Sequence, residues 1–214
     1  MDLFDEQERA TGLQPLAPGA SLLRGFARDA APDLLAALAD IAATSPFRHL
    51  VTPGGHTMSV ATTSCGTLGW HSDETGYRYT ARDPHTGRPW PALPGCFLAL
   101  ARQAAERAGF PGFVPDACLI NRYAPGARLT LHQDRNERDY GAPIVSLSLG
   151  IPATFLFGGL RRSDRTLKLR LVHGDVVVWG GPSRLAFHGV QPLAHAEHPL
   201  TGACRINLTF RVAA

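Results

Sequence analysis

Two histidines and one aspartate of this chain could together bind a metal ion. His132 and Asp134 stand two residues apart, so on a strand their side chains would point to the same side. His188 follows 56 residues later, in Ala-Phe-His-Gly, at the end of an expected strand. Two imidazoles and one carboxylate leave positions on a metal open for a chelating co-substrate and O2, as in non-haem Fe(II) oxygenases. The His-x-Asp spacing alone is a weak signal, because a strand-end histidine bonded to a neighbouring acid also has it.

Three further histidines fit structural positions. His173 is the main rival as a ligand, but its setting, Val-His-Gly-Asp, is typical of a turn before a strand. His195 and His198 lie in a polar loop, and we expect both at the surface.

Residues 204–211 carry a second set of chemically active side chains. Apolar and polar residues alternate there without error, so one strand with two different faces is expected. Arg205 and Arg211 share the polar face about 20 Å apart, and side chains reaching toward each other would leave room for a short dicarboxylate. Arginine suits this task because it binds a carboxylate through two parallel hydrogen bonds. The alternative is an edge strand with a solvated polar face. The polar face comprises Arg205, Asn207, Thr209 and Arg211.

Two amphipathic helices are predicted to support these strands. The first covers residues 32–43, with Pro32 near its start and Asp33 in its first turn. The second covers residues 96–108, and Gly109 is the expected stop. Each helix has one apolar stripe, formed by Leu34, Leu35, Leu38, Ile41 and Ala42 in the first and by Phe97, Leu100, Ala101, Ala104 and Ala108 in the second.

The second half of the chain reads as short strands separated by turns. Apolar runs alternate with turn sequences rich in Gly and Pro, which favours an antiparallel sandwich or barrel. The expected strands are 117–123, 128–132, 144–149, 154–157, 167–172, 175–179 and 205–211. Residues 53–94 have no long period and are rich in Gly, Thr, Ser and Tyr, which is typical of short strands and loops that form a lid.

Composition excludes several classes of protein. With 44% hydrophobic and 18% charged residues, the 214-residue chain can bury a core, so wholesale disorder is excluded. No apolar run is long enough to span a membrane, and the acidic start does not resemble a secretory signal. The four cysteines form no Cys-x-x-Cys pair, which fits a reducing compartment. A cytoplasmic enzyme is therefore expected.

The net charge of +3 is too small to indicate a nucleic-acid binder, but it is unevenly distributed. Residues 1–50 hold 4 basic and 7 acidic side chains, whereas residues 51–214 hold 17 basic and 11 acidic ones. A basic stripe in the second part fits either a solvated strand face or a groove for backbone phosphates. The stripe comprises Arg161, Arg162, Arg165, Lys168 and Arg170.

Five segments together resemble the bacterial AlkB family, which comprises Fe(II)/2-oxoglutarate dioxygenases that repair alkylated nucleic acid. The resemblance covers nearly the whole chain. The segments are 51–59 (Val-Thr-Pro-Gly-Gly-His-Thr-Met-Ser), 116–126 (Asp-Ala-Cys-Leu-Ile-Asn-Arg-Tyr-Ala-Pro-Gly), 131–134 (Leu-His-Gln-Asp), 174–181 (Gly-Asp-Val-Val-Val-Trp-Gly-Gly) and 205–211 (Arg-Ile-Asn-Leu-Thr-Phe-Arg).

The resemblance implies a mainly β fold with flanking helices: a double-stranded β-helix, or jelly roll, with an N-terminal nucleotide-recognition lid. Residues 1–50 would be an N-terminal segment whose helix packs on the core, 51–94 the lid, and 95–214 the jelly-roll core. His132, Asp134 and His188 match the iron ligands. The 2-oxoglutarate site is matched by Asn121, Tyr123, Arg205, Asn207 and Arg211, and the substrate site by Trp70, Tyr77, Arg78, Tyr79, Asn136 and Arg162.

Two positions of this chain depart from the pattern of the family that it resembles. Asn136 stands where a carboxylate usually contacts the target base, although the neighbouring Glu137 could supply a negative charge. His56 replaces a tyrosine often seen in the lid. These differences bear on base preference rather than on the class of reaction.

The implied activity is oxidative dealkylation of bases such as N1-methyladenine and N3-methylcytosine. It would use Fe(II), 2-oxoglutarate and O2 and release formaldehyde, succinate and CO2. The expected partner is alkylated DNA, single- or double-stranded, with RNA left open; no membrane is involved, and a monomer is expected. Trp70 would be the stacking platform for an extruded base, although a packed core indole is the alternative. Two other functions remain open: a 2-oxoglutarate oxygenase acting on a small molecule or a protein side chain, and a non-enzymatic jelly-roll binding module.

Overall fold

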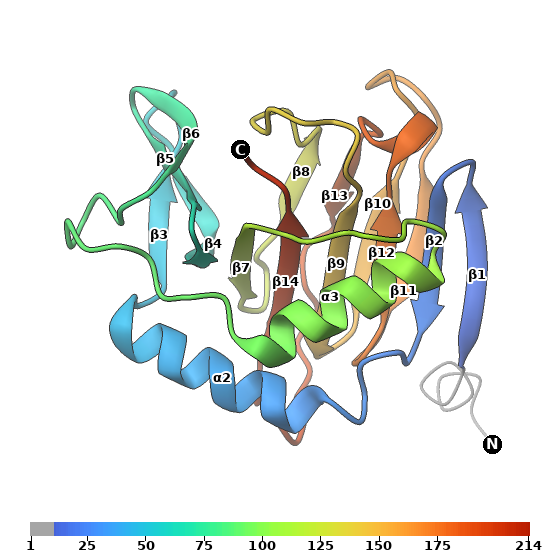
Figure 1. Cartoon of the computed structure of the whole chain (residues 1–214), viewed down its shortest axis with the longest axis horizontal. Helices are drawn as coiled ribbons and strands as arrows, with labels where there is room; N and C mark the ends of the chain where they lie inside the picture. Colours follow the sequence, from blue (N-terminus) through green and yellow to red (C-terminus); the bar gives the residue numbers. More distant parts are fainter. Residues whose placement is uncertain (1–10) are drawn as a thin grey trace.

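The computed structural model describes residues 11–214, and the acidic start on which the secretion argument depends lies outside this range. An eight-stranded sheet runs across the molecule in the order β1-β2-β12-β9-β14-β7-β4-β3, and its neighbours pair in antiparallel fashion (Figure 1). Its strands are β1 (Gly12–Ala17), β2 (Ala20–Arg24), β3 (Arg48–Val51), β4 (Thr57–Gly66), β7 (Ala117–Tyr123), β9 (Ile144–Gly150), β12 (Val176–Trp179) and β14 (Arg205–Arg211).

Two smaller sheets complete the strand structure. A four-stranded sheet has the order β11-β10-β13-β8, and a hairpin is formed by β5 and β6. The strands of the small sheet are β8 (Leu129–His132), β10 (Ala153–Phe157), β11 (Leu167–Leu171) and β13 (His188–Val190); those of the hairpin are β5 (Gly69–Asp73) and β6 (Gly76–Thr80). A 3-10 helix, η1 (Gly181–Ser183), follows β12.

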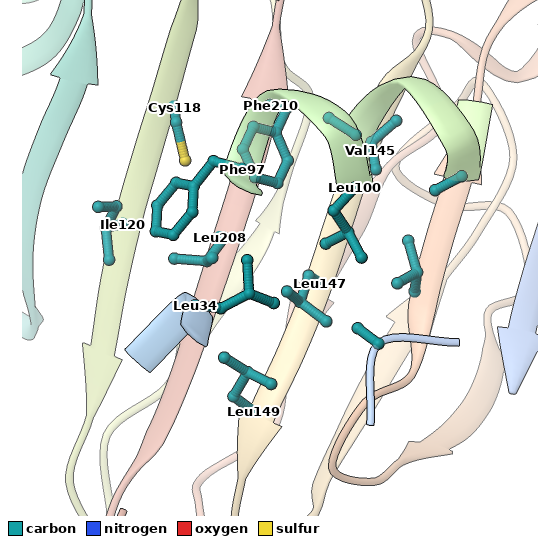
Figure 2. Packing of buried hydrophobic residues seen from close by; sticks show 14 of the residues in the cluster. Leu34, Phe97, Leu100, Cys118, Ile120, Val145, Leu147, Leu149, Leu208 and Phe210 are labelled. Atoms are coloured by element: carbon teal, nitrogen blue, oxygen red, sulfur yellow. The ribbon is translucent and has the colours of Figure 1, made fainter. Parts of the chain in front are cut away.

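Two α-helices cover one face of the large sheet. In Figure 1, helix α3 (Gly95–Arg107) crosses in front of the central strands, and helix α2 (Ala31–Thr44) runs along their lower ends. Figure 2 shows Phe97 and Leu100 of α3 above Leu147 of β9 and Leu208 of β14. Every second residue of these strands points into this apolar layer, because side chains alternate between the faces of a strand. The helices therefore keep one face of the sheet dry.

The opposite face of the large sheet meets the small sheet. Here Trp179 of β12 packs on Phe155 and Phe157 of β10, with ring centroids 6.2 Å apart in each case. This second core fills only part of the space between the sheets, because several residues on this face of β14 and β9 are polar. The polar face of β14 thus points between the sheets, as a jelly roll requires.

The expected elements of the second half are largely confirmed. Strands β7 and β14 have the predicted bounds, and the other five predicted strands each differ by one residue at one end. Both helices lie within one residue of prediction, and Gly109 ends α3 with a positive φ of 91°. The edge-strand alternative for residues 205–211 is wrong, because β14 is central and all seven of its residues are buried.

Two expectations about local structure need correction. His188 begins β13 rather than ending a strand, so the preceding residues are turn and coil. Residues 53–94 do not consist only of short strands and loops, because β4 is ten residues long and pairs with β7 in the large sheet. The β5–β6 hairpin is the part of this segment that stands outside the large sheet.

Candidate metal centre and adjoining pocket

A cavity of about 790 Å³ opens between the two sheets and the β5–β6 hairpin. Its volume is within the range of small-molecule sites in proteins. The polar face of β14 forms one wall, β8 and β13 form another, and the aromatic side of the hairpin lies across from them. The predicted residues that line it are Trp70, Tyr77, Tyr79, Asn121, Tyr123, His132, Asp134, Asn136, His188, Arg205, Asn207 and Arg211.

The pairing of β8 with β13 brings the predicted metal ligands together. His132 and His188 are directly opposite each other across the two strands. Gly189 allows the close approach, because a Cβ at this position would lie 2.8 Å from the carbonyl oxygen of Leu129. Asp134 follows the end of β8, and one ligand atom from each of the three side chains lies within 4.8 Å of the other two.

Hydrogen bonds fix which nitrogen of each histidine can bind a metal. Nδ1 of His132 lies 2.8 Å from the carbonyl oxygen of Thr130, and Nδ1 of His188 lies 3.0 Å from that of Ala186. A carbonyl only accepts, so both Nδ1 atoms donate and both Nε2 atoms keep a free lone pair. Those Nε2 atoms lie 3.8 and 3.7 Å from the Asp134 carboxylate oxygens. Three acceptors face one another without a proton between them, which is the arrangement a cation fits.

The charges around the triad favour the protonation states that bind a metal. Burial alone would raise the pKa of Asp134, but Arg211, His188 and His132 together hold that pKa below its usual range. Burial and then the neighbouring His132 lower the pKa of His188 to about 4. A carboxylate and a neutral imidazole are therefore present at neutral pH without any need to lose a proton.

Arg205 is a buried cation that has no counter-charge among residues 11–214. Its side chain is 1% exposed, and its Nη2 donates to Ser148 Oγ at 2.8 Å. Its Nε and Nη1 are buried and meet no acceptor in the described part of the chain, while its guanidinium carbon lies 5.0 Å from the ring centroid of Tyr123. Unpaired buried donors on a charged group are costly, so this site fits a carboxylate ligand from outside the chain.

Arg211 occupies the other end of the same strand face and is already paired. It donates from Nε and Nη2 to Asp134 Oδ2 at 3.0 and 2.7 Å. Between the two arginines, Asn207 donates to Ser146 Oγ at 2.8 Å. The strand therefore presents one unsatisfied guanidinium far from the triad and one satisfied guanidinium beside it.

The aromatic side chains of the hairpin close the pocket opposite the triad. Trp70 and Tyr77 stack with ring centroids 5.6 Å apart and an interplanar angle of 16°. Trp70 Nε1 donates to Asn136 Oδ1 at 3.3 Å, and Tyr79 donates to Glu137 Oε1 at 2.7 Å. The alternative interpretation of Trp70 as a packed core indole is wrong, because its side chain is only half-buried and lines the cavity. Two flat rings at the mouth offer a stacking surface for another flat ring.

Two of the predicted substrate residues do not line the pocket. Arg78 lies on the other side of β6 from Tyr77 and Tyr79 and binds Asp73, with Nη1 2.8 Å from Oδ1. Arg162 lies in the β10–β11 connection and donates to the carbonyl oxygen of Leu131 at 2.7 Å. Arg162 thus contacts the strand that carries His132 rather than the cavity itself, and the substrate role of both arginines stays a prediction.

The remaining predicted residues have mixed outcomes. His173 lies in the β11–β12 turn, away from the triad, and stacks on His198, which is half-buried rather than fully at the surface. Four of the five arginines and lysines of the basic stripe are exposed, and Arg170 is half-buried. His56 lines the cavity.

Sequence reasoning missed or misread three residues near the triad. Trp179 was not among the predicted site residues, yet it lines the cavity, with its ring centroid 4.9 Å from that of His188. Glu137 was considered as a charge for the base, yet its two oxygens already accept from Tyr79 and from Arg184. Arg184 itself is 3% exposed, and its turn-like setting gave no signal of this burial.

Within the described part of the chain, no helix is long and apolar enough to cross a membrane.

Comparisons with known proteins agree with this geometry. The family model of the 2OG-Fe(II) oxygenase superfamily matches residues 19–211. The chain is 60% identical over 214 residues to the alpha-ketoglutarate-dependent dioxygenase AlkB of Salmonella typhimurium, covering all of this chain and 98% of that protein. It is 59% identical over 213 residues to the protein of the same name from Escherichia coli, again covering all of this chain and 98% of that one. A solved structure of OsALKBH1 is similar with a TM-score of 0.81 and 31% identity, over 94% of this chain and all of that one.

Proposed function

Because this chain belongs to the 2OG-Fe(II) oxygenase superfamily and, within it, to the AlkB family, we propose that it repairs DNA by removing N-alkyl groups from bases such as N1-methyladenine and N3-methylcytosine. It is an Fe(II)- and 2-oxoglutarate-dependent dioxygenase that carries out oxidative dealkylation. When bound, iron and 2-oxoglutarate supply the oxidation: O2 is consumed, 2-oxoglutarate becomes succinate and CO2, and the hydroxylated methyl group leaves as formaldehyde. The particular lesion and the form of the nucleic acid are the proposed part.

The chain's own residues would hold the metal and the co-substrate. His132 Nε2, His188 Nε2 and the Asp134 carboxylate would bind Fe(II), since these three atoms face one another with free lone pairs. Arg205 would bind the carboxylate of 2-oxoglutarate that lies away from iron, because its Nε and Nη1 have no other acceptor. Arg211, bonded to Asp134, would border the keto-acid end. Tyr123, whose ring lies beside the Arg205 guanidinium, would help to hold the same distal carboxylate, and Asn207 would line the space between the two ends.

The target base would enter from the side of the hairpin. Extruding a base from a duplex costs a few kcal/mol, and less when the lesion already prevents pairing. Trp70 and Tyr77 support this proposal because they present stacked rings at the mouth, where an extruded base could gain roughly 1–3 kcal/mol of stacking energy. Asn136 could donate from its amide nitrogen to the base, since its Oδ1 already accepts from Trp70.

The exposed residues of the basic stripe would bind the phosphates of the nucleic acid. It extends from the β10–β11 connection along β11, and Arg162 places it next to β8 and hence next to the pocket wall.

We also propose that the enzyme is a cytoplasmic monomer; the four free thiols support a reducing compartment. Light scattering would check the oligomeric state.

The observation that carries this proposal is the three-atom cluster, with an unsatisfied Arg205 on one side and a stacked aromatic pair on the other. The test supplies Fe(II), ascorbate, 2-oxoglutarate and an oligonucleotide containing N1-methyladenine or N3-methylcytosine, and measures formaldehyde and succinate together. We expect both products in equal amounts, and neither when 2-oxoglutarate is omitted. The same oligonucleotides as RNA and as duplexes would rank the forms of the substrate. Succinate formed with another class of substrate, and no formaldehyde from any oligonucleotide, would favour hydroxylation of a small molecule or a protein side chain.

A further inference from the structure

Arg184 connects three separate points of the segment that carries the aspartate ligand. It follows η1 and is 3% exposed. Its Nε donates to the carbonyl oxygen of Ala142 at 3.0 Å, its Nη1 to the carbonyl oxygen of Asp134 at 3.1 Å, and its Nη2 to Glu137 Oε2 at 3.1 Å. All three nitrogens of one guanidinium are therefore used on residues 134–142.

This segment has little regular structure to hold it in place. Residues 133–143 contain neither helix nor strand, so no ladder of backbone hydrogen bonds fixes the position of Asp134. The side chain of Arg184 holds the segment instead, because it donates hydrogen bonds to two of its backbone carbonyls. Its guanidinium also lies 5.3 Å from the ring centroid of Tyr140, within the same segment. A planar group with donors in a rigid fork can define three directions at once, which a flexible ammonium cannot.

The same arginine balances the charges behind the metal site. Glu137 is 2% exposed at its side chain and forms ion pairs with Arg184 at 3.1 Å and with Arg211 at 3.4 Å. Arg211 in turn binds Asp134 at 2.7 Å. Two carboxylates and two guanidiniums thus form a buried set with no net charge. Loss of Arg184 would leave Glu137 Oε2 without its donor, and Arg211 would be the one cation left in this set for two carboxylates.

We infer that Arg184 is a positioning residue for the metal centre. It fixes the main chain of Asp134 relative to His132 and His188, and its ion pair with Glu137 leaves the shorter hydrogen bonds of Arg211 to Asp134. Partners behind the ligands commonly change metal affinity or activity by about 10- to 100-fold when they are removed. This inference deepens the proposed function and rests on it, because it concerns the same metal site.

The test measures metal binding directly rather than turnover. Variants Arg184→Gln and Arg184→Lys are titrated with Co(II), a redox-stable substitute for Fe(II), by isothermal calorimetry, and their melting temperatures are recorded. We expect affinity for Co(II) to fall about 10- to 100-fold in both variants. Lysine keeps the charge but has a single nitrogen, so it cannot reach all three acceptors. Arg184→Lys also serves where the glutamine variant does not fold.

Arg24→Gln is the matched control. Arg24 also donates to a backbone carbonyl, that of Arg170 at 2.8 Å, and to a buried carboxylate, that of Asp175 at 2.7 Å, but it does not line the pocket. Its loss should lower the melting temperature and leave Co(II) affinity unchanged. Wild-type affinity in Arg184→Gln, or its recovery in Arg184→Lys, would overturn the inference about the three-donor fork. If the wild-type protein itself binds no Co(II), the proposed function fails instead.

Discussion

Replacement of Arg205 by methionine should separate binding of 2-oxoglutarate from stability of the fold. The guanidinium is buried, and two of its nitrogens have no acceptor among the residues that the structure describes. Methionine keeps much of the length of the side chain and needs no partner. In the absence of ligand, the substitution removes one bond to Ser148 and one desolvated charge, so we expect a change of about 1 kcal/mol or less in the free energy of unfolding.

The loss should appear only when 2-oxoglutarate is present. Two hydrogen bonds between a guanidinium and a carboxylate, at about 1.5 kcal/mol each, amount to about 3 kcal/mol, or roughly a 150-fold weaker Kd. At a ligand concentration of 100 times the wild-type Kd, binding stabilises the wild-type protein by about 2.7 kcal/mol and the variant by only about 0.3 kcal/mol. For a domain of this size, the difference corresponds to about 5–10 °C in Tm.

The assay is thermal unfolding of wild type and Arg205→Met, with Co(II) present and with and without 2-oxoglutarate. Arg122→Met is the matched control, since Arg122 lies on the neighbouring strand β7 but is exposed and points to Phe47, outside the pocket. The control should respond to 2-oxoglutarate as the wild type does. If Arg205→Met is stabilised by 2-oxoglutarate as much as the wild type, the unsatisfied guanidinium does not bind the co-substrate and the reasoning is refuted.

Four further predictions concern the ligands, the base, pH and the core. His132→Ala should abolish formaldehyde release yet leave the circular dichroism spectrum unchanged, because it removes a partly exposed ligand and leaves no buried charge unpaired; activity with iron would contradict its role. Asn136→Asp should favour cationic lesions over neutral N3-methylthymine by roughly five- to tenfold, since a charged hydrogen bond is worth about 1 kcal/mol more than a neutral one. Competition between oligonucleotides that carry the two kinds of lesion measures this preference. An unchanged ratio of repair rates would show that the residue does not contact the base. Burial and then the neighbouring His198 lower the pKa of His173 to about 4, so unfolding takes up a proton and stability falls as the pH drops from about 6.5 toward 4. Urea unfolding at pH 7 and pH 5 should therefore show a smaller loss in His173→Gln than in the wild type, by about 1 kcal/mol or less because solvent screens this half-buried ring, and equal losses would contradict the shift. Leu147→Ala should cost about 2–5 kcal/mol in urea unfolding, because its side chain is fully buried beneath α3, and a loss below 1 kcal/mol would mean that the layer collapses around the gap.

The strands that carry the site could be predicted because their signals are local. Residues 205–211 alternate strictly, and the turn sequences on either side of residues 117–123 delimit that strand. The pairing of His132 with His188 could not be predicted in this way, because the expected strand ended at His188, whereas β13 begins there. What the periodicity could not provide is the identity of the neighbouring strands, which the family resemblance supplied instead.

The features that escaped prediction depend on contacts between distant residues. Strand β4 is rich in threonine and serine, yet most of it is buried, because its hydroxyl groups find partners such as the bond from Thr63 to the carbonyl oxygen of Ser45 at 2.7 Å. Arg184 follows Gly-Gly-Pro-Ser, which indicates only an exposed turn, whereas its acceptors lie 42 to 50 positions away in the sequence. Hydropathy and spacing register neither kind of contact.

Strand β14 serves the dry layer beneath the helices and the reactive cavity with alternate residues. A single inserted residue would exchange the two sets of side chains beyond the insertion. An arginine would then point toward Phe97, or a leucine toward the iron site. Tolerance to length changes should therefore differ sharply from tolerance to substitutions here: Ile206 or Leu208 can become other aliphatic residues, but the spacing between the two arginines cannot change by one. The register of this strand should therefore tolerate less change than the identity of most of its residues.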